Sequence, residues 1–126
     1  MKITCCIASR GRPAALVGVV MAAHRLKSGD HPVNFLLGMD NDDPDIGRVI
    51  SILEGAAPVE ISTGLGIPAT RGHIENRMLK RAIEEGADAV TFLTDRTFII
   101  TPQWDTVMSH AVMSVPQRVV WRACPE

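Results

Sequence analysis

Aromatic residues and net charge are both scarce in this chain, and the two shortages argue against several kinds of binding protein. Its 126 residues include three Phe, two Trp and no Tyr. Proteins that hold single-stranded nucleic acid stack its bases on aromatic side chains, so this composition does not suit such a role. The formal net charge is -1 at pH 7, so no overall positive field attracts nucleic acid or an anionic membrane. We therefore expect no nucleic acid among the partners of this protein.

Long apolar runs and cysteines are scarce as well. The longest apolar run, Ala14 to Ala23, is about ten residues long, whereas a helix that spans a bilayer needs roughly 20 residues. Arg10 and Arg12 interrupt the apolar N-terminal segment, which is untypical of a signal peptide. The three cysteines form no Cys-x-x-Cys pair, and we expect buried free thiols, as in a reducing cytoplasm. The sequence thus predicts a cytoplasmic protein with no membrane span.

Short apolar runs that alternate with amphipathic segments indicate the fold class. We expect strands at Lys2–Ala8, Val33–Met39, Val59–Ser62, Asp88–Leu93 and Gln117–Trp121. We expect the intervening helices to begin near Pro13, Pro44, Arg71 and Pro102. Such alternation is typical of a mostly parallel sheet with helices on both faces. The sequence therefore predicts a single α/β domain over residues 1–126, a three-layer α/β/α sandwich of Rossmann-like form.

Three polar clusters follow apolar runs at the points where strands should end. They are Ser9–Pro13, Asp40–Pro44 and Thr94–Thr97. In an open parallel sheet, ligands bind beyond the carboxyl ends of the strands. If the strand order is 3-2-1-4, the ends of strands 1, 2 and 4 lie side by side and the clusters share one crevice. Their arginines and aspartates suit a phosphorylated ligand, with or without a divalent cation.

The first two clusters supply most of the candidate ligand residues. Arg10 and Arg12 are candidates for phosphate contact because the guanidinium fork matches phosphate oxygens. The alternative is that both arginines are solvated loop charges. Asp40, at the strand end itself, can accept hydrogen bonds from a base or a ribose. Asp42 belongs to the same cluster, and we count it with the ligand-binding residues.

The remaining acids near strand ends have both structural and functional interpretations. Asp43 and Asp45 flank Pro44, and we interpret them as residues that cap the following helix. Asp95 ends the fourth expected strand next to Arg96, and both are candidates for the site. The alternative for Asp95 and Arg96 is a local surface ion pair, which contributes little.

Taken in order, these motifs resemble the nucleotide-binding half of a glycosyltransferase with the GT-A fold, of the family 2 type. The likeness extends over about the whole chain and depends on the order and spacing of several segments. They are Ile7–Pro13, Leu37–Pro44, Ile74–Arg77 with its Asn76, Phe92–Phe98 and the Pro-x-Trp segment Thr101–Asp105.

The resemblance implies that the ligand is a nucleotide-diphosphate sugar. Arg10 and Arg12 would contact phosphate or base, Asp40 the nucleoside, and Asp95 the ribose or a metal ion. In that family, two or three acids at the end of the fourth strand hold Mn²⁺ or Mg²⁺ on the diphosphate. Because this chain has only Asp95 there, we expect weak dependence on a divalent cation, with Arg96 supplying part of its positive charge.

The family's acceptor-binding half, which carries the catalytic base, normally follows such a segment, whereas this sequence stops at Glu126. We therefore expect no useful rate of sugar transfer by the isolated chain. A homodimer or a partner chain would complete the cleft. The alternative function is a non-catalytic binding or assembly module that retains the fold.

Overall fold

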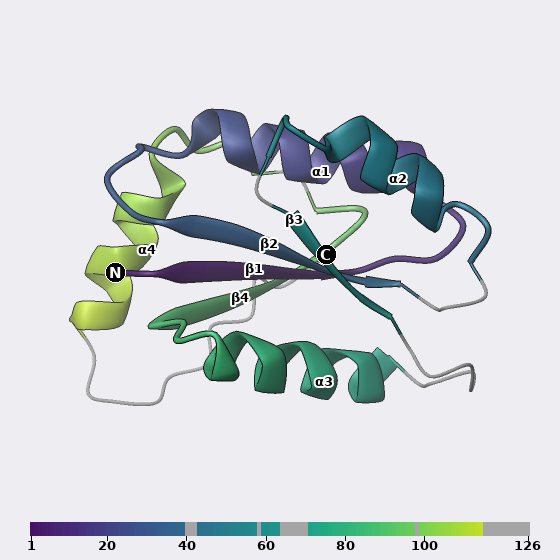
Figure 1. Ribbon diagram of the computed structural model, residues 1–126. Helices are drawn as coiled ribbons and strands as arrows, with labels where there is room; N and C mark the ends of the chain where they lie inside the picture. Colours follow the sequence, from purple (N-terminus) through teal and green to yellow (C-terminus); the bar gives the residue numbers. More distant parts are fainter. Residues whose placement is uncertain (40–42, 58, 64–70, 98, 115–126) are drawn as a thin grey trace.

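Strands and helices alternate along the chain, as the sequence predicts (Figure 1). The computed structural model describes residues 1–39, 43–57, 59–63, 71–97 and 99–114. The described elements, in chain order, are β1 (Ile3–Ala8), α1 (Pro13–Leu26), β2 (Val33–Met39), α2 (Ile46–Leu53), β3 (Val59–Thr63), α3 (Arg71–Glu84), β4 (Ala89–Thr94) and α4 (Trp104–Met113). The expected fifth strand, Gln117–Trp121, lies outside the described residues.

The strands form a parallel sheet in the order β3-β2-β1-β4. This confirms the order 3-2-1-4 and the parallel arrangement. In register, Ala8 at the end of β1 lies opposite Gly38 of β2 and Thr94 of β4. The segments that follow these three strands therefore begin next to one another, at one edge of the sheet that we call the carboxyl edge.

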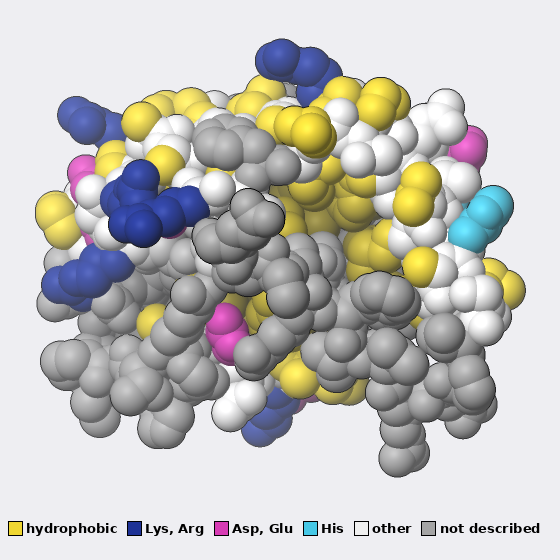
Figure 2. Space-filling model, turned by 180° about the vertical axis from the view of Figure 1, so that it is seen from behind, with side chains coloured by type: hydrophobic (Ala, Val, Ile, Leu, Met, Phe, Trp, Pro, Cys, Tyr) yellow, Lys and Arg dark blue, Asp and Glu magenta, His cyan; other side chains and the backbone are white. Residues whose placement is uncertain are grey.

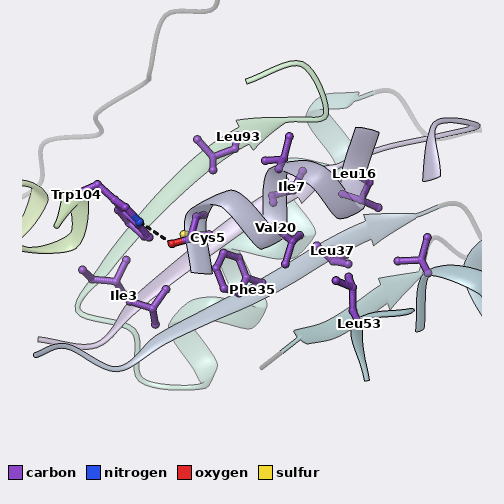
Figure 3. Close-up of a cluster of buried hydrophobic side chains, with 14 of the residues drawn as sticks. Ile3, Cys5, Ile7, Leu16, Val20, Phe35, Leu37, Leu53, Leu93 and Trp104 are labelled. Carbon is purple, nitrogen blue, oxygen red and sulfur yellow. Dashed lines mark hydrogen bonds between the residues drawn. The ribbon is translucent and has the colours of Figure 1, made fainter. Parts of the chain in front are cut away.

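Helices cover both faces of the sheet (Figure 1). One apolar cluster joins alternate β1 residues such as Ile3 and Ile7 to the buried side of α1, and Figure 3 shows them beside Leu16 and Val20. Residues of α2 and α4 belong to the same cluster. On the opposite face, Cys6 packs with residues of α3. The structure thus establishes an α/β fold with helices on both sides of a parallel sheet.

Cys5 and Cys6 lie on opposite faces of the sheet, and both are buried free thiols, as predicted. Burial raises the pKa of Cys5 far above its usual range, and the negative charges of Cys6 and Asp105 raise it further. Burial, together with the charge of Glu85, raises the pKa of Cys6 to about 12. Since the thiolate is the reactive form, neither cysteine is suited to nucleophilic chemistry.

Beneath the carboxyl edge, side chains of α3 pack directly on Gly38 of β2. A Cβ atom placed on Gly38 would lie 2.6 Å from Ile74 Cγ2 and 2.8 Å from Met78 Sδ. A larger residue here would force these side chains, or the helix that carries them, to shift.

Two helices begin later than their prolines suggest. The sequence predicts that α2 begins near Pro44, whereas it begins at Ile46. A turn comes first, in which the backbone oxygen of Asp43 accepts a hydrogen bond from Ile46 N at 3.4 Å. Similarly, α4 begins at Trp104, two residues after Pro102, since Gln103 takes a left-handed conformation with a φ of 56°.

Candidate functional site

The loop that leaves β1 is tied to both neighbouring strands. Ser9 N donates a hydrogen bond to the backbone oxygen of Gly38 on β2 at 3.0 Å. Ser9 Oγ donates to Asp95 Oδ2, just beyond β4, at 2.9 Å. The adjacency of strands 1, 2 and 4 thus brings the first and third polar clusters into direct contact, as the strand order predicts.

Arg12 and Asp95 form an ion pair across the carboxyl edge. The distance from Arg12 Nη1 to Asp95 Oδ1 is 3.9 Å, with the arginine side chain 44% exposed and the aspartate 13% exposed. Such a long, half-exposed pair contributes little to stability. It does keep a guanidinium, with its fixed fork of donors, beside the ends of β1 and β4.

The N-terminus of α1 lies at the same place. Arg12 occupies the N-cap position without a side-chain capping bond, and the first turn contains no acidic residue. The first amides of a helix lack intrahelical acceptors and carry a partial positive charge. The guanidinium of Arg12 and the positive end of this helix therefore both favour a negatively charged group here.

Asp43 connects the loops that follow β1 and β2. Its side chain is only 5% exposed. Asp43 Oδ1 accepts from Asp45 N at 2.9 Å, and Oδ2 accepts from Gly11 N at 3.4 Å. The predicted capping role is correct only in part: the N-cap residue of α2 is Asp45, which makes no side-chain capping bond, and Asp43 instead closes the turn before it. The contact of Asp43 with Gly11 is not predicted from the sequence.

The turn after β4 is held by threonines. The hydroxyls of Thr94 and Thr97 are hydrogen-bonded at 2.9 Å, and Arg96 N donates to Thr94 Oγ1 at 3.2 Å. Arg96 is exposed, and the ion pair that the structure records for Asp95 is with Arg12. In the described part of the chain, Asp95 therefore pairs with Arg12 of another loop, and not with its neighbour Arg96 as the alternative interpretation proposed.

Three other candidates have less structural detail. Arg10 is exposed in the same loop as Arg12. Asp40 and Asp42 lie outside the described residues, although the residues that flank them, Met39 and Asp43, are both buried at this edge. Their proposed contacts with a nucleoside stay predictions. Figure 2, seen from behind, shows Lys and Arg side chains gathered at the end of the molecule that holds the carboxyl edge.

The proposed metal ligand, Asp95, already has two partners. Its Oδ2 accepts from Ser9, and its Oδ1 lies near Arg12. Within the described ranges, no three His, Cys, Asp or Glu side chains come together as a metal site. Mg²⁺ in proteins is often held by one or two carboxylates together with waters and substrate phosphates. The dependence on a divalent cation therefore stays a prediction.

At the other edge of the sheet, α4 lies beside the end of α1 (Figure 1), and Asp105 in its first turn is fully buried. Its two carboxylate oxygens accept from Ser28 N and Ser28 Oγ, each at 2.7 Å. Burial alone would raise the pKa of Asp105, but the hydrogen bonds from Ser28 outweigh it and lower the pKa. Asp105 lies in the first turn of α4, and its carboxylate binds a segment outside that helix.

Trp104 completes this contact between α4 and α1. Trp104 Nε1 donates to the backbone oxygen of Ala23 at 2.8 Å, as Figure 3 shows, and Gln103 N donates to that of Leu26 at 2.7 Å. Both acceptors belong to the last turn of α1, where carbonyls lack intrahelical donors. The Pro-x-Trp segment therefore holds two helices together and lies away from the candidate site.

The architecture and the carboxyl edge define an α/β protein with a candidate anion site at the ends of a parallel sheet. Comparison of the chain with models of known protein families, and with curated proteins, gave no match. Within the described ranges, every helix is too short or too polar to reach across a lipid bilayer.

Proposed function

We propose that this chain binds a nucleotide-diphosphate sugar at the carboxyl edge, as the nucleotide-binding part of a GT-A-like glycosyltransferase of the family 2 type. In this proposal the fold is the corresponding three-layer, Rossmann-like sandwich. The observation that carries the proposal is the half-exposed guanidinium of Arg12 at the N-cap of α1, 3.9 Å from Asp95. Parallel α/β sheets bind their ligands at this edge.

The diphosphate is assigned to Arg12 and the adjoining helix terminus. A bidentate guanidinium and uncapped helix amides together bind phosphate oxygens well. Because the pair with Asp95 is long, Arg12 can turn from the carboxylate to a phosphate at little cost. Arg10 and Arg96, which are exposed on the adjoining loops, add positive charge for the same ligand.

The nucleoside is assigned to the acidic side of the edge. Asp40, with Asp42, would accept hydrogen bonds from the base or ribose, and Asp95 would accept from the ribose. The cation of the resembling family is not required in this proposal, since Arg12 and Arg96 supply positive charge to the diphosphate directly. Binding of UDP in EDTA should therefore be within tenfold of binding in Mn²⁺.

The first test is calorimetric titration of the chain with UDP, GDP and their sugars. Arg12→Ala should weaken UDP binding about tenfold to a hundredfold, because a charge-assisted hydrogen bond contributes about 1.5–3 kcal/mol. Asp40→Asn should weaken binding about tenfold to a hundredfold for the same reason. Arg25→Ala is the matched control, since Arg25 is an exposed arginine in the last turn of α1, at the opposite end of the helix. Equal affinities of wild type and Arg12→Ala would remove Arg12 from the site.

A second candidate function is a non-catalytic binding or assembly module. The observation that favours it is the engagement of Asp95 by Ser9 and Arg12, which leaves no free carboxylate pair in the described part of the site. Release of UDP from UDP-sugars over a broad panel of acceptors separates the two functions. Acceptor-dependent turnover on the order of 1 s⁻¹ identifies an enzyme, and absence of any nucleotide binding favours the module.

A further inference from the structure

Asp43 is the buried carboxylate that the proposed ligand contacts do not use. At 5% exposure it is far more buried than an aspartate usually is. A buried carboxylate is costly unless hydrogen bonds satisfy it. The donors that the structure records for Asp43 are two backbone amides, Asp45 N and Gly11 N, which belong to loops after different strands.

The hydrogen bond from Gly11 to Asp43 lies in the loop directly before Arg12. Gly11, the residue before Arg12, has a φ of 67°, in the left-handed region that glycine adopts readily. The earlier ties of this loop are at Ser9, to Gly38 and to Asp95. The next regular bond, from Leu16 N to the backbone oxygen of Arg12, already belongs to α1. The bond from Gly11 N to Asp43 therefore ties the peptide between Ser9 and Arg12 to the loop that follows β2.

We propose that Asp43 is a positioning residue, which holds the loop so that the Arg12 guanidinium faces Asp95 and the phosphate position. In this proposal Asp43 acts through the loop, since each of its oxygens accepts from a backbone amide. The inference rests on the proposed function for its effect on nucleotide binding. Its structural part, the ordering of Gly11 and Arg12, applies to the protein without ligand.

Two variants separate the two hydrogen bonds of Asp43. Asp43→Asn keeps the size of the side chain but has one acceptor oxygen, so it cannot accept from both amides. Asp43→Ser can still close the turn with Asp45 N, as serine does in such turns, but its shorter side chain does not reach Gly11. Asp45→Asn is the matched control because Asp45 contributes its backbone amide, and no side-chain capping bond, to this arrangement.

The first measurement is made without ligand. Backbone ¹⁵N relaxation should show lower order parameters for Gly11 and Arg12 in Asp43→Asn and Asp43→Ser, with no change in Asp45→Asn. Thermal unfolding shows whether each variant folds. If Asp43→Asn does not fold, Asp43→Ser is measured in its place. Asp43→Ser is the decisive variant because it does not reach Gly11, and Asp43→Ala replaces it if it does not fold. Unchanged order at Gly11 and Arg12 in that variant overturns the proposal, whatever the protein binds.

The second measurement is a double-mutant cycle with Arg12→Ala, read by titration with UDP and with uridine. Asp43→Ser should lower UDP affinity about fivefold, leave uridine affinity unchanged, and have no further effect once Arg12 is replaced. A general loss of structure would instead lower both affinities and add to the effect of Arg12→Ala, which overturns the proposal. If wild type binds neither UDP nor GDP, the proposed function fails, and the relaxation result alone decides the role of Asp43.

Discussion

Two aspartates at opposite ends of α1, Asp105 and Asp95, have contrasting surroundings. Asp105 is fully buried and accepts two hydrogen bonds of 2.7 Å from one serine, Ser28. Asp95 is 13% exposed and has one bond of 2.9 Å and one ion pair of 3.9 Å. Both carboxylates have partners. A ligand could replace a partner of Asp95 at less cost, because losing a partner of the fully buried Asp105 would leave a buried charge without compensation.

The difference shows how this fold separates stability from binding. The end of α1 near Asp105 is closed by short bonds from α4, including that of Trp104 to Ala23. At the carboxyl edge, Arg12 and Asp95 lie on loops, where the distances between partners are longer and the arginine is more exposed. Binding residues are commonly found on loops that a rigid scaffold positions. The three predictions below test this contrast.

The largest effect is expected from Asp105→Ala. The substitution leaves the amide and hydroxyl of the half-buried Ser28 without these acceptors, and it should lower the free energy of unfolding by about 3 kcal/mol. Asp95→Ala, at the open end, removes one hydrogen bond from Ser9 and one long ion pair, and should cost less, about 1 kcal/mol. Urea denaturation monitored by circular dichroism measures both. Equal losses for the two variants would contradict the contrast between the ends.

A smaller effect is expected from Gly38→Ala, beneath the carboxyl edge. The added Cβ would lie 2.6 Å from Ile74 Cγ2, so α3 must shift, and overpacking of this kind costs about 2 kcal/mol. Gly47→Ala on α2 is the control, because no atom lies within 4 Å of its new Cβ, and it should stabilise the helix by about 0.5–1 kcal/mol. Stability of Gly38→Ala equal to wild type would mean that α3 is loosely packed under the site.

The sequence predicts the fold well because burial determines it. The apolar run Val33–Met39 becomes β2 with the same bounds, and the alternation of strands and helices produces the parallel sheet. The meeting of Arg12 and Asp95 follows from the strand order, since the two residues lie in the segments that follow the adjacent strands β1 and β4. These features depend on periodicity and topology, which are visible in the chain.

Contacts between side chains of separate loops could not be predicted in the same way. The bond of Asp43 to Gly11 and those of Ser28 to Asp105 join residues 32 and 77 positions apart. Each depends on angstrom-scale distances between loops, and hydrophobic periodicity does not encode such distances. The Pro-x-Trp segment contributes to the resemblance described above, but the sequence does not predict the hydrogen bond from Trp104 to Ala23 at the end of α1.

The smallest effect concerns His24, in the last turn of α1 near the closed end. Its ring meets that of Phe35 edge to face, with centroids 6.3 Å apart, and its Nδ1 is buried without a hydrogen-bond partner in the described part of the chain. Burial, and then the positive charge of Lys27, lower the pKa of His24 below the usual 6.5. The closed end therefore favours the neutral ring.

This shift makes stability fall on mild acidification. The unfolded chain takes up a proton at His24 as the pH falls through about 6.5, whereas the folded protein takes it up only at lower pH. Stability is therefore complete above pH 6.5 and is lost progressively between 6.5 and the lowered pKa of the folded state. Urea midpoints at about pH 8 and about pH 5.5 should differ for wild type and for His110→Gln, whose replaced histidine is exposed on α4. The difference should be smaller in His24→Gln, and an unchanged difference would show that the ring of His24 is reached by water and that this end of α1 is not closed.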